Sequence, residues 1–275
     1  MSLVRVCGAL GLAAASALLL AWSLRRKERR AVRDGRRRIM VVCTGSVAAV
    51  KAAELVRILI EDHQVFVDLV LTKSASFFQD VDYNGCKGRS LITRLQQMRS
   101  NDGSTPWLEV WLDEDEWRGY KNIGNGVVHI DLAKRNVVLL FAPLCANSLA
   151  QLVGGGASSL ALSVARAWAY DLEETFALPI RKRCGDHVVQ KPFIVAPAMN
   201  TLMWHQKVTQ AHLSVLRDRG VIVLDPIEKV LACGDKGQGA MVDPKTIADA
   251  ASRLLDAHEE SAAQAKRGGC PDFLL

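Results

Sequence analysis

Short apolar runs alternate along most of the chain with segments whose apolar positions recur at helical spacing. The short runs favour buried strands, because strands of a parallel sheet are covered on both faces. Strands are predicted at residues 39–44, 66–72, 127–132, 137–142, 193–196 and 221–224. Helices are predicted at residues 47–61, 207–219 and 244–258, and as two pieces within 146–170 that are separated by the glycines at 154–156.

The pattern breaks down between residues 80 and 126, where Gly, Asn, Asp and Ser are scattered among three tryptophans. This region predicts long loops with one short helix near residues 91–99. The alternation on both sides of it predicts an α/β fold, a doubly wound parallel sheet in a three-layer αβα arrangement. Ligands of such sheets bind beyond the carboxyl ends of the strands.

Residues 6–24 form an uncharged apolar stretch that is followed by nine basic and two acidic residues in 25–38. The stretch predicts an N-terminal transmembrane helix, and the basic flank predicts that the domain behind it lies on the cytosolic side of the endoplasmic reticulum or the outer mitochondrial membrane. A cytoplasmic or mitochondrial protein is the alternative. The predicted organisation is a membrane anchor at 1–38, one domain at 39–258 and a disordered tail at 259–275.

The net charge of +6 comes from the basic flank, and the remainder of the chain is slightly acidic. A nucleic-acid partner is therefore not expected, because that function requires a basic face on the domain itself. The seven cysteines form no C-x-x-C pair and no zinc-ligand spacing, so no metal site is expected and a reducing compartment is favoured.

The first candidate motif is TGSVAA at residues 44–49, where a predicted strand runs into a Gly-Ser turn and a helix. Free backbone N–H groups, the helix dipole and two hydroxyls at such a point are suited to hold a phosphate. Ser46 is equally compatible with a simple helix N-cap.

Further motifs also follow predicted strands. APLCANS at 142–148 and PAMNTLMW at 197–204 are compatible with ordinary caps and core packing, whereas LACGDKGQGAM at 231–241 predicts a flexible glycine loop that carries a thiol. His129 lies between apolar neighbours and is compatible with a core histidine. The residues alone indicate a phosphate-bearing ligand in an α/β crevice, with His129, Asn200 and Cys233 as candidate polar groups.

In this order, GSVAA, HIDL, AP-x-x-AN, PAMN-x-x-MW and ACGD-x-G-x-GAM resemble the motifs of phosphopantothenoylcysteine decarboxylases, across residues 38–258. The resemblance implies a flavodoxin-like (Rossmann-type) protomer that binds FMN and assembles as a homotrimer, with a heterotrimer as the alternative. It implies decarboxylation of 4′-phospho-N-pantothenoylcysteine to 4′-phosphopantetheine in coenzyme A biosynthesis, with the flavin carrying the redox chemistry.

Residue roles are carried over by motif. The implied FMN contacts are Gly45, Ser46, Val47, Thr72, Lys73, Ser74, Cys145, Ala146, Asn147, Ser148 and Ala198. The implied substrate contacts are Asn200, Met203 and Ala232. The implied catalytic residues are His129 as acid or base, Asn200 as holder of the substrate carboxylate, and Cys233 as proton donor to the product.

The sequence departs from the family where Ser158 and Ser159 replace a usual Asp-Asn pair, and where 83–104 and 172–190 are longer than usual. Two alternatives remain. One is a non-catalytic regulatory or partner subunit of a mixed trimer, of the phosphatase-inhibitor type. The other is a related flavin-dependent cysteine decarboxylase with a different substrate.

Overall fold

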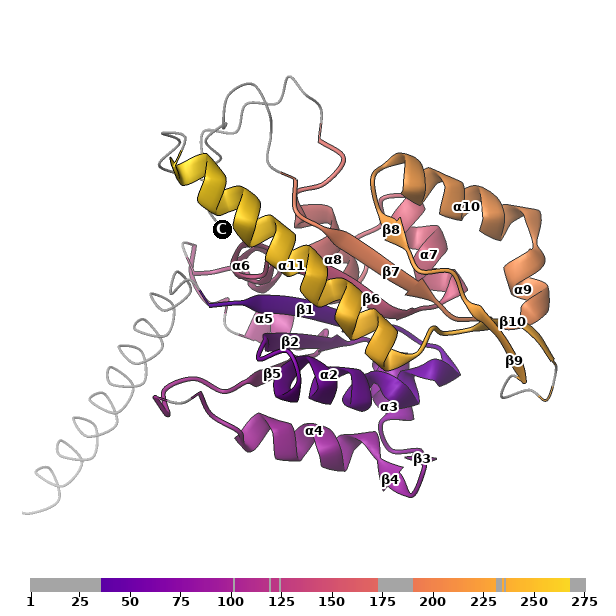
Figure 1. The fold of residues 1–275 in the computed structure, drawn as a ribbon, viewed down its shortest axis with the longest axis horizontal. Coiled ribbons are helices and arrows are strands. Elements are labelled where there is room, and N and C mark those ends of the chain that lie inside the picture. Colours follow the sequence, from indigo (N-terminus) through magenta and orange to yellow (C-terminus); the bar gives the residue numbers. More distant parts are fainter. Residues whose placement is uncertain are drawn as a thin grey trace, which may run out of the picture. The chain divides into compact units, whose positions relative to one another are not determined.

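The computed structural model describes residues 36–267, with gaps at 101, 119, 124, 173–189, 231–233 and 235. Its centre is a parallel sheet of six strands in the order β5-β2-β1-β6-β7-β8 (Figure 1). The strands are β1 (Arg38–Cys43), β2 (Phe66–Leu71), β5 (Leu108–Trp111), β6 (Val138–Leu144), β7 (Phe193–Pro197) and β8 (Ile222–Val223). By position in the sequence this is the 3-2-1-4-5-6 order of Rossmann-type sheets, so the order reverses between β1 and β6.

Helices cover both faces of the sheet. In β1, Ile39 and Val41 pack into the cluster on one face, whereas Met40 and Val42 pack into the cluster on the other, as the period of two along a strand requires. The first face is covered by α2 (Ala52–Glu61) and α11 (Pro244–Arg267), with α4 (Gly88–Gln97) packed against α2. The second face is covered by α6 (Val128–Arg135), α7 (Ala146–Val153), α8 (Leu160–Ala167) and α10 (Lys207–Asp218).

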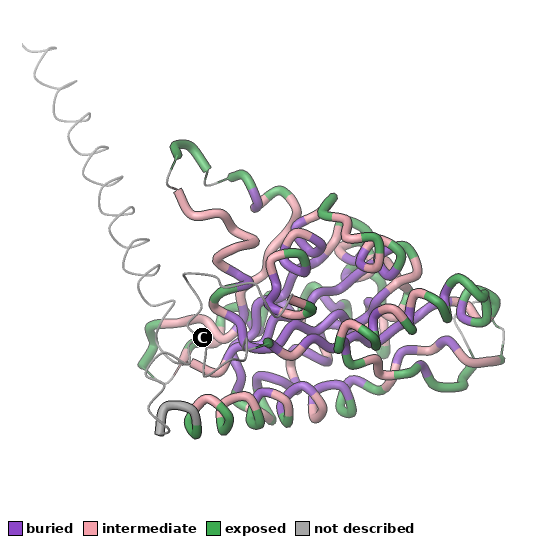
Figure 2. The backbone as a smooth tube through the Cα atoms, turned by 90° about the horizontal axis from the view of Figure 1, so that it is seen from above, coloured by how far each residue is buried: buried purple, intermediate pink, exposed green. Residues whose placement is uncertain are grey.

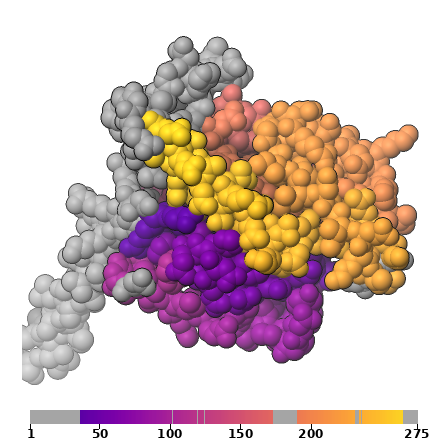
Figure 3. All heavy atoms as spheres, viewed as in Figure 1, coloured from indigo at the N-terminus to yellow at the C-terminus, as the bar shows by residue number. Residues whose placement is uncertain are grey.

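The figures show the same layering. In Figure 2 buried backbone runs between helices that are exposed on their outer sides, and in Figure 3 α11, in yellow, crosses the face beside the early elements in indigo and purple. The predicted doubly wound, three-layer αβα sheet is therefore confirmed.

Smaller elements surround the sheet. They are the 3-10 helix η2 (Val47–Lys51), α3 (Lys73–Phe78), α5 (Asp115–Arg118), α9 (Thr201–His205), and two antiparallel hairpins, β3 (Asp82–Tyr83) with β4 (Cys86–Lys87) and β9 (Ile227–Val230) with β10 (Lys236–Ala240). The β9–β10 hairpin lies beside α9, at the end of the sheet to which β6 and β7 point (Figure 1).

Three element predictions are wrong. Residues 127–132 were predicted as a strand but enter α6, because Val128 and Leu132 face the sheet at a spacing of four that a six-residue apolar run does not distinguish from alternation. The region predicted as loops contains the edge strand β5. Helix α11 continues to Arg267, so part of the predicted tail at 259–275 is helical.

The fold class must also be corrected at the N-terminus. Within the part of the chain that the structure describes, no helix is both long and apolar enough to cross a membrane. The predicted transmembrane stretch at 6–24 lies outside the described residues, and the transmembrane helix is removed from the fold assignment. The membrane location rested on the same stretch and gains no support.

Candidate functional site

The polar motifs meet at the carboxyl edge of β1 and β6, where the order of the sheet reverses. Thr44, the fully buried residue after β1, joins the two strand ends. Its N–H and its hydroxyl both donate to the carbonyl of Pro143, at 3.1 and 2.9 Å, and its Oγ1 accepts from the N–H of Cys145 at 2.8 Å. Thr44 therefore fixes the loop after β1 against the loop after β6.

The Gly-Ser turn after Thr44 lies directly against the segment that follows β2. A Cβ on Gly45 would lie 2.7 Å from the Cβ of Ser74, a distance that only glycine avoids. Ser46 caps η2, and Thr72 caps α3 while its N–H donates to the carbonyl of Cys43 at 3.1 Å. The structure thus brings together two segments of the predicted FMN site, residues 45–47 and 72–74.

The third segment begins at Cys145, the N-cap of α7. Burial raises the pKa of the Cys145 thiol, but hydrogen bonds with Ser148 and Thr44 and with the N–H groups of Ser148 and Asn147 outweigh burial, so the net effect lowers the pKa. The N–H of Ala198, after β7, donates to the carbonyl of Leu144 at 3.0 Å. All three predicted segments and Ala198 therefore lie along one edge of the sheet.

A cavity of about 280 Å³ opens next to this edge, at the ends of β2 and β5. Leu71, Lys73 and Phe77 line one side and Leu112 and Asp113 the other. It shares Lys73 with the predicted FMN contacts, but neither His129 nor Asn200 lines it. The cavity therefore lies beside the segments 45–47, 72–74 and 145–148 and Ala198, which together we call the strand-end cradle.

Asn200 is the N-cap of α9, and its Oδ1 accepts from the N–H of Leu202 at 2.8 Å. The backbone of β10 presses against this segment, because the N–H of Met199 donates to the carbonyl of Gly239 at 3.0 Å. A Cβ on Gly239 would lie 2.2 Å from the carbonyl oxygen of Met199, and a Cβ on Gly237 would lie 2.6 Å from Oγ1 of Thr201. Gly237 and Gly239 thus allow the backbone of β10 to lie close to the segment that contains Asn200.

Two predicted residues of the same loop, Ala232 and Cys233, lie outside the described residues, in the connection between β9 and β10. Met203, predicted to contact substrate, is exposed on α9. Their roles stay predictions.

His129 is the second residue of α6, not a strand residue as predicted. Its Nδ1 lies 2.5 Å from Oε1 of Glu116, which belongs to α5. The His129 side chain is 24% exposed and that of Glu116 7% exposed. The ring is thus accessible, whereas its carboxylate partner is buried.

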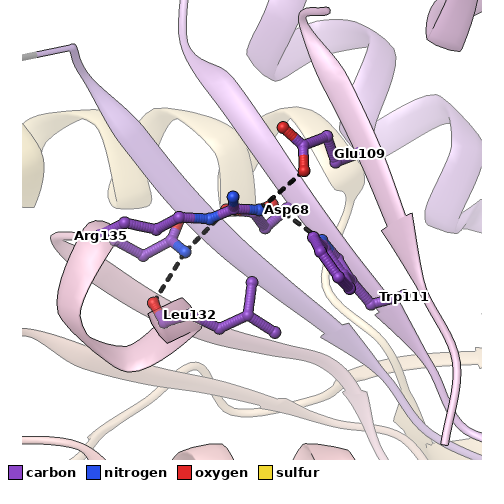
Figure 4. A network of polar contacts seen from close by, with 6 residues as sticks. Asp68, Glu109, Trp111, Leu132 and Arg135 are labelled. Carbon is purple, nitrogen blue, oxygen red and sulfur yellow. Dashed lines mark hydrogen bonds and ion pairs between the residues drawn. The ribbon is translucent and has the colours of Figure 1, made fainter. Parts of the chain in front are cut away.

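The other end of α6 is fixed by charged side chains that surround the fully buried Asp68 (Figure 4). Arg135 donates through Nε to Oδ2 of Asp68 at 2.8 Å, contacts Oδ1 of Asp68 through Nη2, and donates to Oε2 of Glu109 at 3.0 Å. Lys191 donates through Nζ to the carbonyls of Ala133 at 2.9 Å and Asn136 at 2.6 Å, at the C-terminus of the helix. Cations at this position complement the helix dipole.

The first motif of the sequence analysis already contains Thr44 as a phosphate-binding hydroxyl, whereas its role in joining the ends of β1 and β6 is visible only in the structure. Sequence reasoning missed Glu116. Glu116 is one of four acidic residues in 113–116, and no sequence pattern distinguishes it from its exposed neighbour Glu114.

Together, the 3-2-1-4-5-6 sheet and the hydroxyl-rich cradle at its switch point define a protein of the class that binds a phosphate-bearing ligand at the carboxyl ends of parallel strands. Residues 27–256 match the family model described as "Flavoprotein". The chain is 35% identical to a phosphopantothenoylcysteine decarboxylase of Arabidopsis thaliana over 210 residues, which cover 76% of this chain and 81% of that protein. A rice enzyme of the same name is 35% identical over 217 residues, with 79% and 80% covered.

Solved structures give the same result. A cysteine-to-serine mutant of PPC decarboxylase complexed with pantothenoylaminoethenethiol matches with a TM-score of 0.61 and 32% identity, covering 80% of this chain and 99% of the other. The FMN binding protein AtHal3 matches with a TM-score of 0.59 and 32% identity, covering 81% and 98%. The chain belongs to the flavoprotein family and, within it, to the phosphopantothenoylcysteine decarboxylases.

Proposed function

We propose that this chain is an FMN-dependent carboxy-lyase that converts 4′-phospho-N-pantothenoylcysteine to 4′-phosphopantetheine in coenzyme A biosynthesis. The observation that carries the proposal is the match of residues 27–256 to the flavoprotein family model, together with 35% identity to a phosphopantothenoylcysteine decarboxylase over 210 residues. A non-catalytic partner subunit is not favoured, because the chain retains His129, Asn200 and Cys233 and its relatives are named decarboxylases.

The strand-end cradle fits FMN. Gly45 leaves the backbone of the first turn bare of a side chain, and Ser46, Thr72 and Ser74 surround it with hydroxyls. Such a turn is suited to the phosphate of a nucleotide. We assign the flavin contacts to Gly45–Val47, Thr72–Ser74, Cys145–Ser148 and Ala198.

When bound, FMN supplies the two-electron chemistry that makes the carboxylate of a cysteine derivative easy to lose. The chain's own residues bind, orient and protonate. In the proposal Asn200 binds the substrate carboxylate through its side-chain amide, with Met203 and Ala232 beside it. His129 exchanges a proton beside the flavin through Nε2, since Nδ1 faces Glu116. Cys233 gives a proton to the decarboxylated product.

The proposal includes a trimer whose subunits complete one another's sites, and it favours a homotrimer. Its support is a set of large apolar side chains that are exposed in the single chain. Most lie on α3, on α5 and the loop after it, and on α9, α10 and β9: Phe77, Trp117, Tyr120, Ile123, Leu202, Met203, Val208, Ile227 and Val230. Large exposed apolar side chains of this kind are the surface that a subunit interface would cover.

The test is turnover of the phosphorylated substrate by the purified, FMN-loaded chain, followed by mass spectrometry of the product. Wild type is expected to form 4′-phosphopantetheine, and Cys233→Ser to retain FMN but accumulate an unsaturated decarboxylated thiol. Normal turnover by Cys233→Ser would remove the proton-donor role while leaving the activity itself intact. No turnover by wild type would contradict the proposed function.

A further inference from the structure

Glu116 is a buried carboxylate on a one-turn helix, and its described partner is a ring nitrogen of His129. Oε1 lies 2.5 Å from Nδ1 of His129, while Oε2, which is also buried, has no hydrogen-bond partner among the described residues. An ionised carboxylate only accepts hydrogen bonds, so Nδ1 of His129 has to be the donor. The contact therefore selects the Nδ1–H form of the neutral ring and leaves Nε2 as the proton-accepting atom.

Burial of the Glu116 carboxylate destabilises the folded chain, and no interaction that the structure describes within α5 compensates for it. A carboxylate removed from water is stabilised only when its oxygens are paired, and here one oxygen of Glu116 is unpaired among the described residues. The neighbouring Trp117 is exposed, so the short helix α5 directs the carboxylate of Glu116 inward and the large apolar side chain of Trp117 outward. The arrangement is better explained by a requirement of the histidine than by stability.

The remainder of α6 is fixed without Glu116. Arg135 and Lys191 attach the last turn of the helix to β2, β5 and the segment before β7. The backbone of His129 is therefore held, and what stays undetermined is the orientation and tautomer of its ring. Glu116 determines both.

We infer that Glu116 is the positioning residue of the catalytic histidine, holding His129 in the Nδ1–H tautomer so that Nε2 exchanges the proton. This rests on the proposed function, in which His129 acts beside the flavin. Residues behind an active-site histidine fix tautomer and orientation in this way in metal sites and in Ser-His-Asp triads.

The experiment uses the full chain labelled with ¹⁵N-histidine, with and without FMN, and reads the Nδ1 and Nε2 chemical shifts of His129. The His129 signals are assigned as those missing from His129→Gln. The inference predicts that neutral His129 in wild type carries its proton on Nδ1. In Glu116→Gln the amide can accept from Nδ1–H or donate to Nδ1, so a population with the proton on Nε2 is expected. FMN binding should be retained, while kcat falls by about 10- to 100-fold and KM changes by less than about threefold.

Two variants provide controls. Glu116→Asp keeps the charge but shortens the side chain, and it is expected to recover part of the lost kcat and the Nδ1–H signal. Glu61→Gln removes an exposed carboxylate of α2, paired with Arg57 at 3.0 Å, and is expected to change neither readout.

The outcomes are distinct. A wild-type His129 protonated on Nε2 overturns the inference, as does a Glu116→Gln enzyme with wild-type kcat. Should Glu116→Gln fail to fold, the wild-type tautomer decides alone. If wild type shows the Nδ1–H tautomer but has no decarboxylase activity, the pairing stands and the proposed function fails.

Discussion

The ion pairs of Arg135 with Asp68 and Glu109, at the C-terminal end of α6, allow a quantitative prediction of how one substitution changes the free energy of unfolding. Asp68 is fully buried and receives hydrogen bonds from Arg135, from Nδ2 of Asn136 at 2.8 Å and from Nε1 of Trp111 at 2.9 Å (Figure 4). Arg135→Met removes the guanidinium and leaves the carboxylate with uncharged donors alone. Removal of one partner of a buried ion pair costs about 3–5 kcal/mol, and we expect the lower part of this range because two donors remain.

The pH dependence provides a second, independent readout. Burial raises the pKa of Asp68, but the charge and hydrogen bonds of Arg135, the charge of Arg38 and the hydrogen bond from Asn136 outweigh it, so the net effect lowers the pKa. A carboxyl whose pKa is lowered by folding stabilises the protein above its unfolded pKa of about 3.9, and this stabilisation is lost as the pH falls through the folded pKa. In Arg135→Met burial prevails, so Asp68 becomes easier to protonate in the folded state.

The assay is urea unfolding of the full chain without added FMN, between pH 7 and pH 4.5. The free energy of unfolding should be about 3 kcal/mol higher for wild type than for Arg135→Met at pH 7. This difference should become smaller toward pH 4.5, where Asp68 of the variant is increasingly protonated. Arg217→Met, which breaks an exposed pair with Asp225, is the matched control and should cost at most about 1 kcal/mol. If the two variants lost the same free energy of unfolding, or if the difference between wild type and Arg135→Met did not change with pH, the ion pair of Arg135 with Asp68 would not be the source of the stability.

Three further predictions concern the strand-end cradle and the glycine loop. Gly45→Ala should weaken FMN binding by about tenfold or more and lower the free energy of unfolding in urea by about 1–3 kcal/mol, because its Cβ would clash with Ser74. Ser74→Gly in the same chain should restore the free energy of unfolding, but not the FMN affinity, because it also removes a hydroxyl of the cradle. A lack of rescue in unfolding would contradict the contact. Gly239→Ala should lower the free energy of unfolding by about 1–3 kcal/mol in the same assay and raise KM for the substrate, because its Cβ would clash with the carbonyl of Met199. An unchanged KM would show that the glycine loop does not contribute to the substrate site. Because its pKa is lowered, Cys145 should be alkylated by iodoacetamide below pH 8 faster than an ordinary thiol, as measured by mass spectrometry. Bound FMN should protect it from alkylation. Equal labelling with and without FMN would place the thiol outside the cofactor site.

The central strands could be predicted from the sequence because β1, β2 and β6 are buried on both faces and are therefore mostly apolar, with Asp68 as the charged exception inside β2. The edge strand β5 was missed, since only Leu108 of its four residues is fully buried and the strand lies in a polar region. Residues 127–132 were predicted as a strand but enter helix α6, because a short apolar run fits both the period of two of a strand and the period of about 3.6 of a helix.

The segments of the cradle could be predicted because each follows a strand, and parallel strands end at the same edge. Glu116 could not, since its pairing with His129 joins residues thirteen apart across two short helices and a loop. The contact arises from the packing of α5 on α6 and has no periodic signature in the sequence.

The most direct test of the account is release of labelled CO₂ from 4′-phospho-N-pantothenoylcysteine carrying ¹³C in its cysteine carboxyl group, measured as FMN is titrated into flavin-free protein. We expect one FMN to bind per chain and ¹³CO₂ release to rise in proportion to the bound flavin. A chain that takes up no FMN, or that takes it up and releases no label, would contradict it.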